Sequence, residues 1–84
     1  MNNIKLLKKK ILYRSEYRGT KEMDLLLGNF VKKYIDDFSI EELNQLVDLL
    51  NIDDDSLFKW YLKKKEKINI PNNKVSNLLR NFKI

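Results

Sequence analysis

The chain has 84 residues, 43% hydrophobic and 35% charged, which is enough for one small domain with a small core. It contains no cysteine and no histidine, so disulfides, thiol nucleophiles and the commonest acid–base catalyst near neutral pH are excluded. The net charge of +5 favours an acidic protein surface, a nucleic acid or an anionic membrane as partner. Because the chain lacks both histidine and cysteine, an enzyme acting alone is disfavoured.

The first helix is predicted over residues 3–17, where Ile4, Leu7 and Ile11 recur at helical spacing. Gly19 is expected to end it as the C′ residue, because glycine adopts positive φ without steric cost. The chain has only two glycines, so a glycine at this position indicates a turn between two helices.

The second helix shows a regular buried stripe, with apolar residues spaced by three or four positions. These residues are Met23, Leu26, Leu27, Phe30, Val31 and Tyr34. Gly28 lies within the predicted helix and lowers its stability by about 1 kcal/mol relative to alanine. It is predicted to let a neighbouring helix pack closely.

The sequence FSIEEL at residues 38–43 predicts the start of the third helix. Ser39 and Glu42 have the spacing of a capping box, in which each side chain accepts the backbone N–H of the other residue. Phe38 is expected to pack against Leu43 across this helix start. The predicted inner face consists of Leu43, Leu46, Val47 and Leu50.

A fourth helix is predicted to begin with Asp54 as its N-cap and to end near the lysines at 63–65. Its apolar residues are Leu57, Phe58, Trp60, Tyr61 and Leu62. Pro71 marks a break, and a short last helix follows with Val75, Leu78, Leu79 and Phe82. The predicted fold is all-α, a compact bundle of four to five short helices in one domain spanning residues 1–84.

Two stretches resemble a known family: RGTKEMD at residues 18–24 and DDSLFKW at residues 54–60. The first has the form R-G-x-x-E followed by an acid, and the second places an acid, an aliphatic residue, an aromatic residue and a tryptophan in order. Together they are similar to the SdhE family, bacterial relatives of the mitochondrial succinate dehydrogenase assembly factor. The resemblance covers roughly residues 4–83. It departs from the family at Tyr17, Thr20 and Asp55, where other residue types are usual.

The resemblance implies a helical chaperone that binds the flavoprotein subunit of succinate dehydrogenase, and often that of fumarate reductase. Such proteins promote covalent attachment of FAD to a histidine of that subunit, and we expect no tightly bound cofactor or metal in this chain. The contact patch carried over from the family is Arg18, Gly19, Glu22 and Asp24. A chain without a signal sequence or a membrane-spanning stretch is expected to be a cytoplasmic bacterial protein, monomeric when free.

Two interpretations of the patch are open from the residues alone. In a structural interpretation, Arg18 binds carbonyls at the end of the first helix and Glu22 stabilises the start of the second. In a functional interpretation, the helix break presents Arg18 and Glu22 side by side on an exposed corner for one protein partner. The family resemblance favours the functional one. Trp60 and Phe58 are predicted to be mainly core residues.

The alternative function is a small helix-turn-helix protein that binds nucleic acid, which the basic charge would suit. However, the second, third and fourth predicted helices begin with acidic residues, which phosphates would repel. Only the last helix fits that role, through Asn72, Asn73, Lys74, Asn77 and Arg80.

Overall fold

Five helices form the part of the chain that the computed structural model describes, residues 3–63 and 70–83, and this part contains no strand. They are α1 (Asn3–Glu16), α2 (Lys21–Tyr34), α3 (Ile40–Leu50), α4 (Asp54–Lys63) and α5 (Lys74–Asn81). The predicted all-α fold is confirmed. Lys64 and Lys65, predicted at the end of the fourth helix, lie outside the described residues. No described helix has the length and apolarity needed to cross a membrane.

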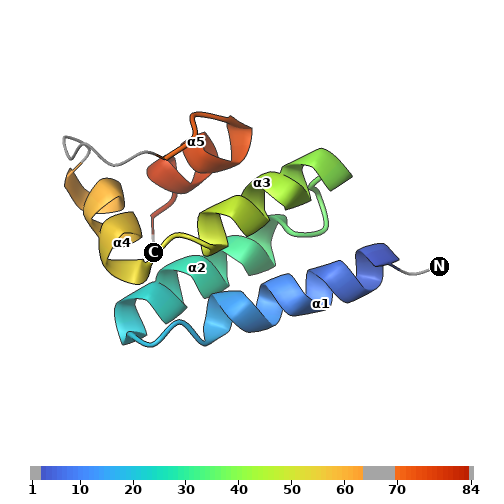
Figure 1. Ribbon diagram of the computed structural model, residues 1–84, viewed down its shortest axis with the longest axis horizontal. Helices are drawn as coiled ribbons and strands as arrows, with labels where there is room; N and C mark the ends of the chain where they lie inside the picture. The colour runs from blue at the N-terminus through green and yellow to red at the C-terminus, as the bar shows by residue number, and fades with distance from the viewer. Residues whose placement is uncertain (1–2, 64–69, 84) are drawn as a thin grey trace.

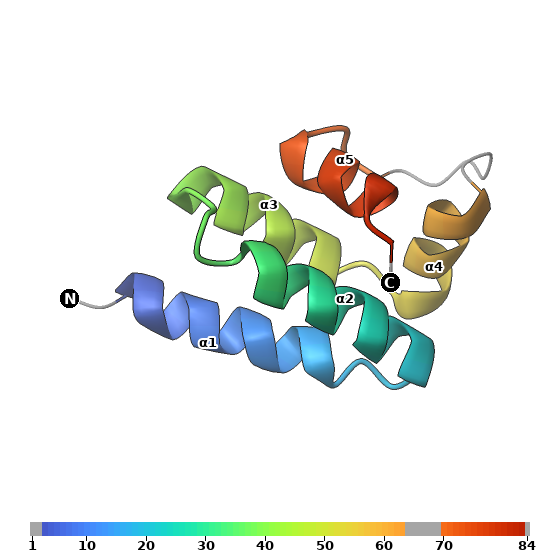
Figure 2. The ribbon, with the colours of Figure 1, turned by 180° about the vertical axis from the view of Figure 1, so that it is seen from behind.

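The helices α1 and α2 lie side by side and antiparallel, and α3 packs against both α1 and α5 (Figure 1). The helices α4 and α5 lie toward the opposite side of the molecule from the N-terminal end of α1 (Figure 2). This arrangement leaves one long side of α1 at the edge of the molecule.

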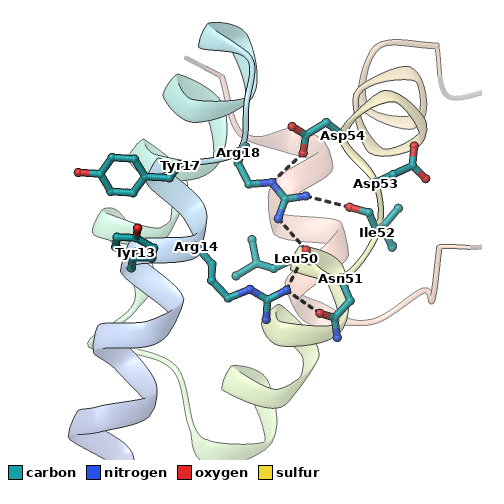
Figure 3. A pocket seen from close by; sticks show the side chains of 9 residues that line it. All are labelled: Tyr13, Arg14, Tyr17, Arg18, Leu50, Asn51, Ile52, Asp53 and Asp54. Atoms are coloured by element: carbon teal, nitrogen blue, oxygen red, sulfur yellow. Dashed lines mark hydrogen bonds and ion pairs between the residues drawn. The ribbon is translucent and has the colours of Figure 1, made fainter.

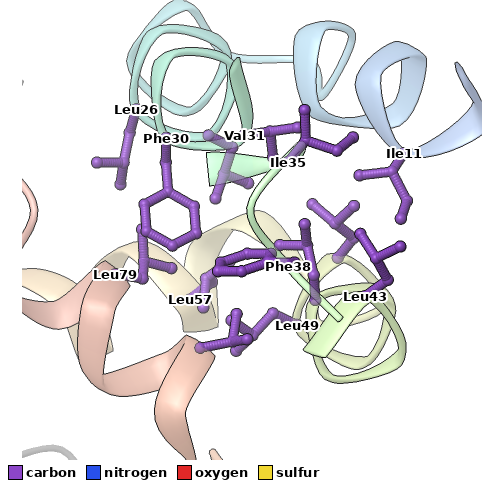
Figure 4. Packing of buried hydrophobic residues seen from close by; sticks show 14 of the residues in the cluster. Ile11, Leu26, Phe30, Val31, Ile35, Phe38, Leu43, Leu49, Leu57 and Leu79 are labelled. Atoms are coloured by element: carbon purple, nitrogen blue, oxygen red, sulfur yellow. The ribbon is translucent and has the colours of Figure 1, made fainter. Parts of the chain in front are cut away.

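The core is centred on α2, as its sequence pattern predicted. Phe30 is fully buried, and its ring centroid lies 5.1 Å from that of Tyr34 and 5.4 Å from that of Phe82 (Figure 4). Leu57 and Trp60 bring α4 into the same cluster, which confirms Trp60 as a core residue. Each such side chain stabilises the fold by about 1.5–3 kcal/mol through burial.

The capping box at the start of α3 is present as predicted. The Ser39 hydroxyl accepts the N–H of Glu42 at 3.2 Å, and the Glu42 carboxylate accepts the N–H of Ser39 at 2.9 Å. That backbone hydrogen bond, followed by the contact with Lys74, lowers the pKa of Glu42. Phe38 lies in the same buried cluster as Leu43, in agreement with the predicted contact.

Gly28 is buried within α2 on the side that faces α1. A Cβ added there would lie 3.6 Å from Glu16 Cγ and 4.0 Å from the Ser15 carbonyl oxygen. The helix α1 packs beside this glycine as predicted, but these are ordinary contact distances, so a methyl group would also fit and the packing does not require glycine.

Candidate functional site

The connection between α1 and α2 begins at Tyr17, because α1 ends at Glu16. Gly19 has a φ of 117°, a conformation that L side chains rarely adopt, so the predicted need for glycine is confirmed. The prediction placed Gly19 directly after the first helix, but α1 ends at Glu16, so Gly19 lies within the connection. Thr20 then caps α2, with its hydroxyl accepting the N–H of Met23 at 3.3 Å.

Arg18 is directed into the molecule, where it joins three groups at the junction of α3 and α4 (Figure 3). Its Nε lies 2.7 Å from Asp54 Oδ1, and its two terminal nitrogens donate to the carbonyl oxygens of Leu50 at 2.6 Å and Ile52 at 2.8 Å. Only 9% of its side chain is exposed. The expected exposed arginine beside Glu22 is therefore wrong, and so is the expected contact with carbonyls of the first helix.

The reason for this orientation is the end of α3. The last carbonyl groups of a helix have no partner within it and carry the negative end of its dipole, so a guanidinium there is favourable. Arg14 also binds the C-terminal end of α3, where it donates to the side-chain oxygen of Asn51 at 2.6 Å and to the Leu50 carbonyl at 3.4 Å. Arg14, in α1, and Arg18, two residues after its end, thus both bind the C-terminal end of α3.

The start of α4 differs from the prediction in a related way. Asp53, not Asp54, is the N-cap, because its carboxylate accepts the N–H of Ser56 at 3.0 Å. This bond, and a further one with the Ser56 side chain, lowers the pKa of Asp53. Asp54, in the first turn of α4, is left free to pair with Arg18. We refer to Arg14, Arg18 and Asp54, with the carbonyls of Leu50 and Ile52 that the arginines bind, as the arginine clamp.

Asp24 holds the same connection from the other side. Its Oδ1 accepts the backbone N–H of Arg18 at 2.6 Å, while its own position in the first turn of α2 suits a negative charge. The backbone of Arg18 is thus fixed by α2 and its side chain by α3 and α4. The turn that carries Gly19 is therefore tied to three helices through Arg18.

Glu22 is exposed and makes no hydrogen bond or ion pair with any residue of the described segments. It borders a hollow of about 290 Å³ between the starts of α2 and α4. The lining residues are Thr20, Glu22, Met23, Asp54, Asp55 and Phe58. Arg18 instead lines a separate, open groove of about 440 Å³, and Asp54 belongs to both surfaces.

A metal centre is not apparent: within residues 3–63 and 70–83, no group of three or more acidic side chains is arranged to hold an ion. The site consists of the turn held by Asp24 and the arginine clamp, with the exposed carboxylate of Glu22 beside a partly apolar hollow. Such an arrangement can bind another protein but offers no enclosed space for chemistry.

Comparison with known proteins places this site in context. Residues 9–83 match the family described as the flavinator of succinate dehydrogenase, Sdh5. The chain belongs to this flavinator family. Proteins named succinate dehydrogenase assembly factor 2, mitochondrial, from Komagataella phaffii and Dictyostelium discoideum, are 38% and 41% identical over 76% and 79% of this chain.

A protein named FAD assembly factor SdhE, from Acetobacter pasteurianus, is 29% identical over 94% of this chain and 70% of its own length. The chain spans 34% and 47% of the lengths of the Komagataella and Dictyostelium proteins. No solved structure matches the chain.

Within this flavinator-family chain, the two motifs that carry the resemblance are in direct contact. Arg18 from the first motif pairs with Asp54 from the second, and the hollow beside Glu22 is lined by both motifs. Sequence reasoning missed Arg14 and the capping role of Asp53. The spacing of the two arginines by four residues was the available signal for a shared target.

Proposed function

We propose that this chain is an assembly factor that binds the flavoprotein subunit of succinate dehydrogenase and promotes covalent attachment of FAD to a histidine of that subunit. The observation that carries the proposal is the meeting of both family motifs beside the turn between α1 and α2, with the carboxylate of Glu22 exposed next to it. The names of the relatives, which refer to succinate dehydrogenase assembly and to FAD assembly, support the choice of client.

The proposed partner-binding residues have different tasks. Glu22 contacts the flavoprotein directly, because its carboxylate is exposed and can accept charge-assisted hydrogen bonds. Gly19 allows the backbone of the turn to approach the partner closely. Arg18 and Asp24 act as positioning residues that hold this turn, through the contacts with Asp54 and with the Arg18 N–H.

The assembly factor needs no nucleophile of its own for this task. The chain has neither histidine nor cysteine to form a covalent flavin link, so the acceptor belongs to the client. Binding the client more tightly in the conformation that aligns the flavin with its acceptor would accelerate the step by positioning alone. No tightly bound cofactor is proposed for this chain, which acts as a monomer on FAD held by the client.

The nucleic-acid alternative has little support from the last helix, on which it depended. Asn73 caps α5, Lys74 pairs with Glu42 at 3.0 Å, and the Arg80 guanidinium lies over the Trp60 ring. Three of the residues that a groove-binding helix would need are therefore engaged within the protein.

The test is coexpression with the flavoprotein subunit, read as covalent flavin fluorescence in a denaturing gel. We expect Glu22→Ala to reduce flavinylation strongly while its thermal melt stays close to that of the wild type. Glu41→Ala is the matched control, because Glu41 is also an exposed acid at the second position of its helix. A folded Glu22→Ala protein with normal flavinylation would contradict the proposed contact.

The same coexpression with the flavoprotein of fumarate reductase asks whether that subunit is a second client. Normal flavinylation of both subunits in cells that lack this chain would contradict the proposed function itself. Gel filtration of the free chain tests the monomeric state.

A further inference from the structure

The outer face of α1 carries an exposed row of apolar and aromatic side chains. Leu6, Tyr13 and Tyr17 are 53%, 65% and 67% exposed, although leucine and tyrosine are usually at least partly buried. Leu6 and Tyr13, seven positions apart, lie along one side of α1, and Tyr17 directly follows the helix. The two tyrosine rings contact each other, with centroids 4.7 Å apart. Figure 3 shows Tyr17 extending away from the arginine clamp.

Positive charge flanks this row on both sides. Helical geometry places Lys5 and Lys9 on one side of the row and Lys10 on the other, and all three are exposed. The guanidinium of Arg14 is instead directed to the end of α3. The helix α1 holds five basic residues and one acid, a net charge of +4 out of +5 for the whole chain. Its one acid is Glu16, and this residue is neutralised by a contact at 3.0 Å with Lys32 of α2.

From this face we propose that α1 binds an anionic lipid surface, lying flat on it. Lysine and arginine can extend their apolar stems along such a surface while their charges remain at the headgroups. Tyrosine suits the boundary between apolar and aqueous regions, because its ring is apolar and its hydroxyl is polar. One leucine and two tyrosines are enough for shallow contact but not for insertion.

The pattern of charge favours a lipid surface over a single acidic protein. The helix α1 lies at the edge of the molecule (Figure 1), and a plane of anionic headgroups can meet Lys5, Lys9 and Lys10 together. A protein partner would need separate acids to match each cation. The inference does not depend on the proposed function, because it concerns a different face and a different kind of partner.

The test is cosedimentation of the full chain with vesicles of phosphatidylglycerol and phosphatidylcholine, compared with vesicles of phosphatidylcholine alone. We expect binding only to the anionic vesicles, and loss of that binding at high salt. Removing one charge should weaken partitioning about fivefold, so Lys9→Gln/Lys10→Gln should weaken it about 25-fold. Tyr13→Ser/Tyr17→Ser should also weaken it, since the rings supply the apolar contact.

The matched control is Lys33→Gln/Lys83→Gln, which removes the same charge from exposed residues outside α1. We expect this control to bind vesicles more tightly than Lys9→Gln/Lys10→Gln. Equal losses in the two double variants would overturn the assignment to α1, and so would failure of the wild type to bind anionic vesicles at low salt. Loss of flavoprotein binding, with vesicle binding retained, in the folded Lys9→Gln/Lys10→Gln protein would identify the face as a protein contact and overturn the proposal.

Discussion

The two ends of α3 are stabilised in opposite ways. At its start, Ser39 and Glu42 satisfy each other's backbone groups within four residues of sequence, and Ser39 is exposed. At its end, the Leu50 carbonyl is bound by two arginines that lie 32 and 36 residues away in the chain, and Arg18 is almost fully covered. One end depends on local sequence and the other on the packing of three helices.

This difference has an energetic consequence. An exposed cap can be replaced by water when it is removed, so its loss is modest. Removing one partner of a covered ion pair leaves a charge and several carbonyl groups without compensation, which is much more costly. The ends of a single helix should therefore respond very differently to single substitutions.

The largest effect is expected for Arg18→Ala. It would leave Asp54, whose side chain is only 20% exposed, without its cation, and the carbonyls of Leu50 and Ile52 without a donor. We expect a loss of about 3 kcal/mol or more in the free energy of unfolding, measured by urea denaturation. Arg14→Ala is the control, since Arg14 binds the same Leu50 carbonyl from an exposed position, and it should cost about 1 kcal/mol or less. Similar losses for both variants would show that burial does not distinguish the two arginines.

The next effect compares the two glycines. Gly19→Ala should destabilise the protein by about 1–3 kcal/mol, because alanine is strained at a φ of 117° even though the added methyl group has room. Gly28→Ala should stabilise it by up to about 1 kcal/mol, because Gly28 lies inside a helix and its added Cβ makes only ordinary contacts. Thermal melts of both variants measure these opposite shifts. A stabilised Gly19→Ala protein would show that the turn can change its backbone conformation.

A smaller loss, about 1 kcal/mol, is expected for Ser39→Ala at the start of α3. The Glu42 N–H would lose its side-chain acceptor but could still bind water. Urea denaturation under the conditions used for Arg18→Ala gives the direct comparison between the two ends of the helix. If Ser39→Ala proved as damaging as Arg18→Ala, the contrast between local and packed ends would fail.

The smallest effect is a change in acid sensitivity. The pKa of Glu42 is lowered in the folded protein, so its contribution to stability is present above the unfolded pKa and is lost as the pH falls through the folded pKa. Glu42→Gln preserves the form of the capping box but removes this titration. The variant should lose stability less steeply than the wild type between neutral pH and about pH 3, as followed by the free energy of unfolding. Parallel curves would mean that Glu42 does not contribute to the acid response.

Much of the fold could be predicted because its signals are local. The apolar stripe of α2, the capping box of α3 and the glycine with positive φ each depend on residues a few positions apart. The same holds for the candidate site as a segment, since Arg18 and Gly19 lie in the connection between α1 and α2, and Glu22 and Asp24 lie in the first turn of α2, as expected. Local periodicity fixes which face of a helix is apolar, and burial of that face then follows.

The direction of the arginines could not be predicted in the same way. The sequence by itself determined that Arg18 follows the first helix and that Asp54 lies at the start of the fourth. Tertiary structure alone decided that these two residues meet, because the end of α3 must be packed beside α1 before its carbonyls can attract a guanidinium. It also left Glu22, in the first turn of α2, exposed and without a hydrogen bond or ion pair to the described part of the chain. A charged side chain can reach several targets, and which one it binds depends on the unpaired polar groups that packing brings within its reach.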